Sequence, residues 1–86
     1  MAWRLIISPA ALKDMDRMPQ WAAAAIGREL EKLAADPATV DIKKLKGRDE
    51  EWRIRVGDWR AIFTFNRTVR AVEVSRVLPR GRAYRE

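Results

Sequence analysis

The stretch from Trp52 to Phe63 constrains the fold most, because bulky apolar residues alternate with arginines on either side of a Gly-Asp pair. Such alternation is typical of β-strands with one buried face, and Gly57-Asp58 fits a two-residue hairpin turn. We therefore predict a β-hairpin. The turn sets its cross-strand pairs: Val56 with Trp59, Arg55 with Arg60, Ile54 with Ala61 and Arg53 with Ile62.

The two faces of this hairpin predict different roles. Arg53, Arg55 and Arg60 share one face, where Arg55 and Arg60 are direct neighbours. A like-charged cross-strand pair destabilises a sheet by up to about 1 kcal/mol unless something compensates. A phosphate would compensate, since guanidinium groups match phosphate oxygens; the alternative is that these arginines extend into solvent or pair with Asp58 or Glu73. The other face is apolar and suits burial: Trp52, Ile54, Val56, Trp59, Ala61 and Phe63.

Before the hairpin, the sequence predicts a strand and two helices. Residues 3–7 suit a short strand, and Ser8-Pro9 supplies a hydroxyl cap followed by proline, a helix start. A second helix is expected from Pro19 to about Ala35, where Asp36-Pro37 ends it. Helical spacing puts Ala11, Leu12, Met15, Met18, Ile26, Leu30 and Leu33 on the buried faces and Lys13, Asp14, Asp16 and Arg17 outside.

After the second helix, residues 38–51 are polar and we expect them to be irregular. A loop at 66–68 leads to a third strand of about residues 70–78, which Pro79 ends, and residues 80–86 are expected to be coil or a short turn. The order β-α-α-β-β-β predicts a single α+β domain over residues 1–86, a helical hairpin packed on one face of a small, mainly antiparallel sheet. Trp52 and Trp59 are expected in the core, and Trp3 and Trp21 against the first strand and the second helix.

Charge is distributed unevenly along the chain. Residues 1–51 contain nine basic and nine acidic residues, whereas residues 52–86 contain nine arginines and three acidic residues. The whole net charge of +6 therefore lies in the second of these segments. This asymmetry favours an anionic partner, nucleic acid first, over a basic surface that serves only solubility.

The residue types that are missing exclude several kinds of chemistry. The chain has no Cys and no His, so it has no disulfide, no thiolate nucleophile and no histidine base. The acidic residues are not spaced as metal ligands, and we expect neither a metal nor another cofactor. The longest apolar run, residues 21–26, is far shorter than a membrane span requires, so we expect a cytoplasmic protein.

Two further basic segments fit an RNA partner. Arg80, Arg82 and Arg85 surround Tyr84, and an exposed tyrosine among arginines can stack on an RNA base. Residues 43–48 form a basic loop that could hold flanking RNA backbone. The alternatives are a tyrosine packed on the sheet edge and a loop that is simply solvated.

Three segments of the chain resemble the RelE/ParE toxin superfamily, and within it the RelE-like mRNA interferases. They are residues 44–47 (Lys-Leu-Lys-Gly), 52–63 and 77–85. The run Arg-Ile-Arg-Val-Gly-Asp-Trp-Arg at residues 53–60 is the most specific part, and the ending with Arg80, Tyr84 and Arg85 is the second. The resemblance covers nearly the whole chain, including the first strand and the helical hairpin.

This resemblance implies a ribosome-dependent endoribonuclease that cuts mRNA in the ribosomal A site. In such toxins the 2′-hydroxyl attacks the adjacent phosphate and no metal is needed. It implies catalytic roles for Arg55, Arg60, Arg80 and Tyr84, with Arg60 and Arg80 on the scissile phosphate and Tyr84 positioning the base. Contacts to RNA or the ribosome are expected from Lys44, Lys46, Arg48, Arg53, Arg76, Arg82 and Arg85.

The chain departs from the family pattern at the general base. Well-studied relatives have a lysine on the strand where this chain has Arg53 and Arg55, and an arginine does not give up its proton. A phenolate at Tyr84 is an alternative, although the ordinary tyrosine pKa of about 10 argues against it. The base is therefore unassigned. Leu78-Pro79 also replaces the small-then-basic pair common before the last arginine.

The resemblance leaves two other functions open. A ParE-like toxin shares the fold but binds DNA gyrase and cuts no RNA. A catalytically weak ribosome-binding module would keep the basic face without the chemistry. Either toxin implies a cognate antitoxin, RelB-like and acidic, in a toxin–antitoxin hetero-oligomer.

Overall fold

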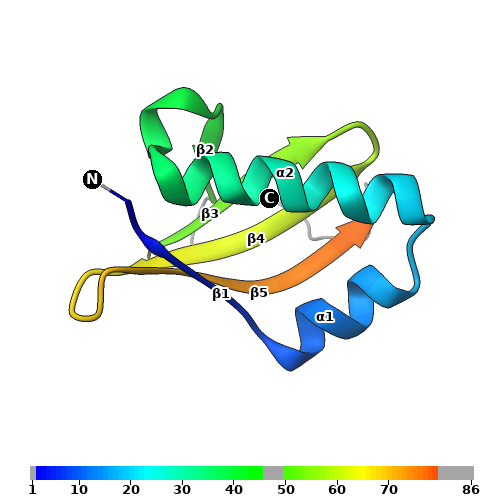
Figure 1. Cartoon of the computed structure of the whole chain (residues 1–86), viewed down its shortest axis with the longest axis horizontal. Helices are drawn as coiled ribbons and strands as arrows, with labels where there is room; N and C mark the ends of the chain where they lie inside the picture. The colour runs from blue at the N-terminus through cyan, green and yellow to red at the C-terminus, as the bar shows by residue number, and fades with distance from the viewer. Residues whose placement is uncertain (1, 46–49, 80–86) are drawn as a thin grey trace.

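A computed structural model of the protein describes residues 2–45 and 50–79. Two helices pack on the sheet, as predicted: α2 lies across one face, and α1 lies beside the end of β5 (Figure 1). The α+β class and the helical hairpin are therefore confirmed. The elements in chain order are β1 (Arg4–Ile7), α1 (Pro9–Asp16), α2 (Gln20–Ala35), a 3-10 turn (Pro37–Thr39), β2 (Ile42–Lys44), β3 (Glu51–Val56), β4 (Trp59–Asn66) and β5 (Ala71–Pro79).

The sheet has the strand order β1-β5-β4-β3-β2. Its pairs are antiparallel except β1 with β5, which run parallel. The β3–β4 hairpin has the predicted register, with Val56 opposite Trp59 and Arg55 opposite Arg60. Gly57 has a φ of 59°, a left-handed conformation that glycine adopts without steric cost, so the Gly57-Asp58 turn fixes this register.

Strand β2 lies within residues 38–51, for which the sequence predicts an irregular segment. Ile42 pairs with Ile54, and Lys44 with Trp52, along the outer edge of β3. A three-residue strand is too short to show a period of two, so only tertiary pairing reveals it. The third predicted strand also shifts by one residue, because Arg70 has a φ of 54° and belongs to the preceding turn.

The core lies between α2 and the inner face of the sheet. The stripe predicted for α2 is buried, and Ile54, Ala61 and Phe63 of the hairpin meet it as expected. Trp52 and Trp59 pack against this core, and Trp3 lies 5.0 Å from the ring of Phe65. The fully buried large side chains are Phe63, Ile26, Leu30, Leu33, Ile54, Val72, Val74 and Val77.

Three predicted orientations on the helices are wrong. Asp14, expected outside, is buried, while Leu12 is 51% exposed and Trp21 is 69% exposed. Helix α1 packs against the edge of β5 rather than flat on the sheet, and its buried side consists of Ala11 and Asp14. The buried stripe of α2 leaves Trp21 outside it.

Helix α1 also completes the hydrogen bonding of the β5 edge. Strand β1 pairs only with the first half of β5, so the second half would present unpaired backbone groups. Ser8 caps α1 by accepting from the Ala11 N–H at 3.0 Å, and its hydroxyl donates to the Ser75 carbonyl at 2.9 Å. The Asp14 carboxylate accepts the N–H of Val77 at 2.9 Å. Within the residues described, no helix is long and apolar enough to cross a membrane.

Candidate nucleic-acid interface

The face of the sheet opposite the helices, called here the open face, presents the predicted arginines. Arg55 and Arg60 lie directly opposite each other on β3 and β4, and Leu78 of β5 lies opposite Arg60 on its other side. One pair further from the turn, Arg53 lies opposite the buried Ile62. The structure therefore brings Arg53, Arg55 and Arg60 to one face, as the alternation predicts.

The pair of Arg55 and Arg60 has no carboxylate partner among residues 2–45 and 50–79. The Nε of Arg55 donates to the Gly57 carbonyl at 3.3 Å, a bond within its own turn. The Nε of Arg60 is buried and has no hydrogen-bond partner in the same part of the chain. An unsatisfied buried donor costs about 1–3 kcal/mol, and natural proteins retain such costs mostly at functional positions. The predicted alternative, pairing of these two arginines with Asp58 or Glu73, does not occur.

Strand β2 adds a basic residue that the sequence prediction did not select. Lys43 lies opposite Arg53 and so belongs to the open face, whereas Lys44 lies opposite Trp52, which faces the helices. Both lysines are exposed. The sequence predicts a loop here and therefore does not distinguish Lys43 from Lys44. The alternation of β2 becomes readable only once its pairing with β3 is known.

Arg76 is occupied by an acidic partner. Its guanidinium donates from Nε to Oδ2 of Asp14 at 2.7 Å and from Nη2 to Oδ1 at 3.0 Å. The hydrogen bond from Arg76 lowers the pKa of Asp14 against the opposing effect of burial, and the Val77 N–H adds to the lowering. The Arg76 side chain remains 48% exposed. Asp14 occupies the Nε and Nη2 groups of Arg76. Arg76 can therefore contact RNA only through the other edge of its guanidinium group.

An acidic row crosses the open face farther from the hairpin turn. Thr64 of β4 lies between Glu51 of β3 and Glu73 of β5, and Ile6 of β1 lies beside Glu73. The Glu73 carboxylate accepts a hydrogen bond from the Asn66 amide at 3.2 Å. The open face is therefore basic near the Gly57-Asp58 turn, where Arg55 and Arg60 lie. It is acidic along the row in which Thr64 lies between Glu51 and Glu73.

The remaining predicted site residues, Lys46, Arg48, Arg80, Arg82, Tyr84 and Arg85, lie outside the described residues. Strand β5 ends at Pro79, opposite Trp59, at the same end of the sheet as the Arg55–Arg60 pair. No group of three or more acidic side chains that could hold a metal ion is found in the described part of the chain. An anion-binding face made of guanidinium groups is the chemistry that this geometry offers.

Comparisons with known structures place this architecture among toxins of toxin–antitoxin systems. The toxin–antitoxin complex RelBE2 of Mycobacterium tuberculosis matches with a TM-score of 0.80 at 22% identity, covering 93% of both chains. The archaeal RelE–RelB complex of Pyrococcus horikoshii matches with a TM-score of 0.78 at 25% identity, covering 95% of this chain and 99% of that one. A variant of the Escherichia coli toxin RelE in the free state matches with a TM-score of 0.78 at 20% identity, covering 96% and 87%. At these identities the likeness establishes the RelE fold.

The sequence comparison then defines the family. Residues 5–84 match the model of the ParE toxin of the type II toxin–antitoxin system parDE. The chain belongs to this toxin family, within the RelE/ParE superfamily that the hairpin and its ending indicated. A comparison with curated proteins found no match.

Proposed function

We propose that this toxin is a metal-independent endoribonuclease that cuts mRNA in the ribosomal A site and thereby inhibits translation. The observation that carries the proposal is the Arg55–Arg60 pair, two neighbouring guanidinium groups with no carboxylate partner in the described chain. Two such groups suit the oxygens of one phosphate. The resemblance of residues 53–60 and 77–85 to RelE-like mRNA interferases supplies the reaction.

The reaction is an in-line transfer at phosphorus. The 2′-oxygen forms a bond to the adjacent phosphorus as the bond to the 5′-oxygen breaks, which leaves a 2′,3′-cyclic phosphate and a 5′-hydroxyl. The hydroxyl proton passes to a base and the leaving oxygen gains a proton. Negative charge accumulates on the phosphorane oxygens, where positioned guanidinium groups are worth most.

The roles assigned to individual residues are part of this proposal. Arg60 and Arg80 contact the scissile phosphate, Arg55 and Arg53 help to hold it, and Tyr84 positions the base. Because the strand has arginines at both positions where relatives use lysine, catalysis rests on charge and positioning rather than on a lysine base. Flanking contacts to RNA or the ribosome come from Lys46, Arg48, Arg76, Arg82 and Arg85. On β2 they come from Lys43 on the open face in place of the predicted Lys44, which lies on the helix side.

The partner in this proposal is an antitoxin. Several of the matching structures are complexes of a RelE toxin with a RelB antitoxin. An acidic RelB-like segment would complement the basic end of the open face and form a toxin–antitoxin hetero-oligomer. The ribosome and mRNA, the proposed targets, place the activity in the cytoplasm.

A second candidate is inhibition of DNA gyrase, which the superfamily resemblance associates with ParE-like toxins. The match to a ParE family model favours it. Under this reading the basic face binds a partner and cuts nothing. A third candidate is a catalytically weak ribosome-binding module. Such a module would bind RNA through the basic face but would cleave it poorly.

A parallel assay separates these candidates. The purified chain is added to mRNA on programmed ribosomes, to mRNA alone and to a gyrase supercoiling reaction. The proposal expects fragments with cyclic or 3′-phosphate and 5′-hydroxyl ends only when ribosomes are present, in buffer containing a chelator. Intact mRNA together with inhibited supercoiling would replace the proposal with gyrase inhibition.

A further inference from the structure

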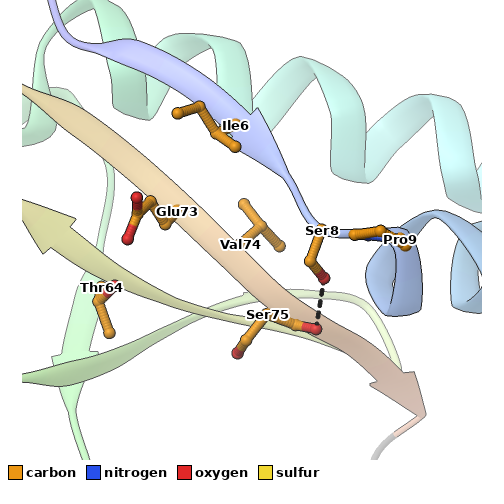
Figure 2. Close-up of a pocket in the computed structure, with 7 residues that line it drawn as sticks. All are labelled: Ile6, Ser8, Pro9, Thr64, Glu73, Val74 and Ser75. Carbon is orange, nitrogen blue, oxygen red and sulfur yellow. Dashed lines mark hydrogen bonds between the residues drawn. The ribbon is translucent and has the colours of Figure 1, made fainter. Parts of the chain in front are cut away.

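A groove of about 400 Å³ lies on the open face at the row of Thr64, four residues along β4 from Arg60, and no role has been given to it. Its walls come from three neighbouring strands, with Ile6 on β1, Glu73 on β5 and Thr64 on β4 (Figure 2). Ile6 is 39% exposed, so its aliphatic side chain forms a wall of the groove that a ligand can reach. The groove therefore combines an apolar wall with a carboxylate and a hydroxyl.

The hydrogen bonding of the lining groups leaves one strong acceptor. The Ser8 hydroxyl already caps α1 and donates to the Ser75 carbonyl, a bond drawn in Figure 2. The Ser75 hydroxyl donates to the Ile62 carbonyl at 3.2 Å. Oε2 of Glu73 accepts from Asn66, whereas its Oε1 has no partner among the described residues. A carboxylate accepts several hydrogen bonds and donates none, so the groove selects ligands that donate.

The charge pattern decides which part of an RNA strand can occupy this groove. A phosphate is attracted to Arg55 and Arg60 and repelled by Glu73. Thr64 is four residues along β4 from Arg60, a span of about 13 Å at the usual strand rise. That span suits a strand whose phosphate rests on the arginine pair and whose neighbouring base enters the groove. Ile6 would then contact the face or edge of the base.

From this geometry we propose that the groove of Ile6, Thr64 and Glu73 is a base-binding subsite that prefers guanine. Guanine alone among the standard bases has two adjacent N–H donors on its Watson–Crick edge. They match Oε1 of Glu73 and the second lone pair of Oε2, whose first lone pair accepts from Asn66. Uracil presents one N–H between two carbonyl oxygens, which Glu73 repels. The inference rests on the proposed function, since it needs an RNA strand held by the arginine pair.

The test is an amide NMR titration of the full chain with 5′-GMP, AMP, CMP and UMP, without ribosomes. GMP should shift the amides of Thr64 and Glu73 and bind about tenfold more tightly than UMP, the lower end of discrimination by a bidentate pair. Glu73→Gln keeps the side-chain shape and the acceptor for Asn66 but should abolish the GMP preference. Glu31→Gln, an equal loss of charge at an exposed position of α2, should leave the preference unchanged.

The controls separate this inference from the proposed function. Arg60→Ala should weaken all four nucleotides alike, because each has the same phosphate. Equal affinity of the wild-type chain for all four nucleotides, or a GMP preference that survives Glu73→Gln, would overturn the subsite even if ribosomal cleavage is observed. A GMP preference lost in Glu73→Gln supports the subsite even if cleavage is absent, in which case the ribonuclease proposal fails alone.

Discussion

The carboxylate of Asp14 on α1 is held by both its oxygens in a bidentate pair with the guanidinium of Arg76 on β5. The N–O distances are 2.7 and 3.0 Å, and the same carboxylate accepts the Val77 N–H at 2.9 Å. These bonds join residues 62 and 63 positions apart in sequence. They attach α1 to the part of β5 that does not pair with β1. They also fix one edge of the Arg76 guanidinium, which lies beside the candidate site.

Removing this carboxylate should destabilise the fold. Asp14→Ala leaves the Val77 N–H without its acceptor and Arg76 without its partner, so we expect a loss of about 1–3 kcal/mol in the free energy of unfolding. Urea denaturation followed by tryptophan fluorescence measures it. Asp14→Asn keeps one acceptor oxygen and should lose less. Equal denaturation midpoints for wild type and Asp14→Ala would show that the pair contributes nothing.

The same pair predicts how stability depends on pH. The hydrogen bond from Arg76, with help from Val77, lowers the folded-state pKa of Asp14 below its ordinary value of 3.8. A carboxyl group with a depressed folded pKa contributes stability above its unfolded pKa, and this contribution is lost as the pH falls through the folded pKa. We expect Asp14→Asn to differ most from wild type near neutral pH and the two curves to converge at the acid end. Parallel curves from about pH 6 to pH 2 would contradict this.

The arginine pair predicts opposite effects on activity and stability. Arg60→Ala should lower the rate of RNA cleavage by about 10²–10³, the usual effect of losing one preorganised donor to the developing charge. The same change removes a like-charged cross-strand neighbour and a buried donor that has no partner among the described residues, so stability should stay equal or rise. Cleavage rates and urea midpoints of the same preparations check both. Arg28→Ala, at an exposed position of α2, is the matched control and should change neither.

Neighbouring lysines on β2 should differ in their effect on RNA binding. Lys43 lies on the open face opposite Arg53, and Lys44 lies on the helix side opposite Trp52. Lys43→Ala should therefore reduce the salt slope of single-stranded RNA binding by about 0.7, the share of one phosphate contact. Lys44→Ala should leave that slope unchanged. Fluorescence anisotropy of a labelled oligonucleotide at several salt concentrations measures it, and equal slopes for the two variants would contradict the assignment of faces.

The parts of the fold that local pattern determines were predictable from the sequence. The Gly57-Asp58 turn and the alternation on both sides of it determined the hairpin register and therefore the arginine face. Burial of Asp14 was not predictable, because its partner is Arg76 and an isolated helix pattern treats every aspartate as solvent-exposed. The exposure of Trp21 and the pairing of Lys43 with Arg53 likewise depend on tertiary contacts. The Glu73 groove required the order β1-β5-β4, which brings Ile6, Glu73 and Thr64 together from three separate segments.

Cell-free translation of a defined mRNA, with cleavage sites mapped by primer extension, tests the central claim most directly. The wild-type chain should produce codon-phased cuts that require ribosomes and that fade in Arg60→Ala, Arg80→Ala and Tyr84→Phe. Such cuts would also show that a site with arginines in place of the family lysines is sufficient for the reaction. Intact mRNA with unimpeded translation, in the presence of folded protein, would contradict the ribonuclease assignment.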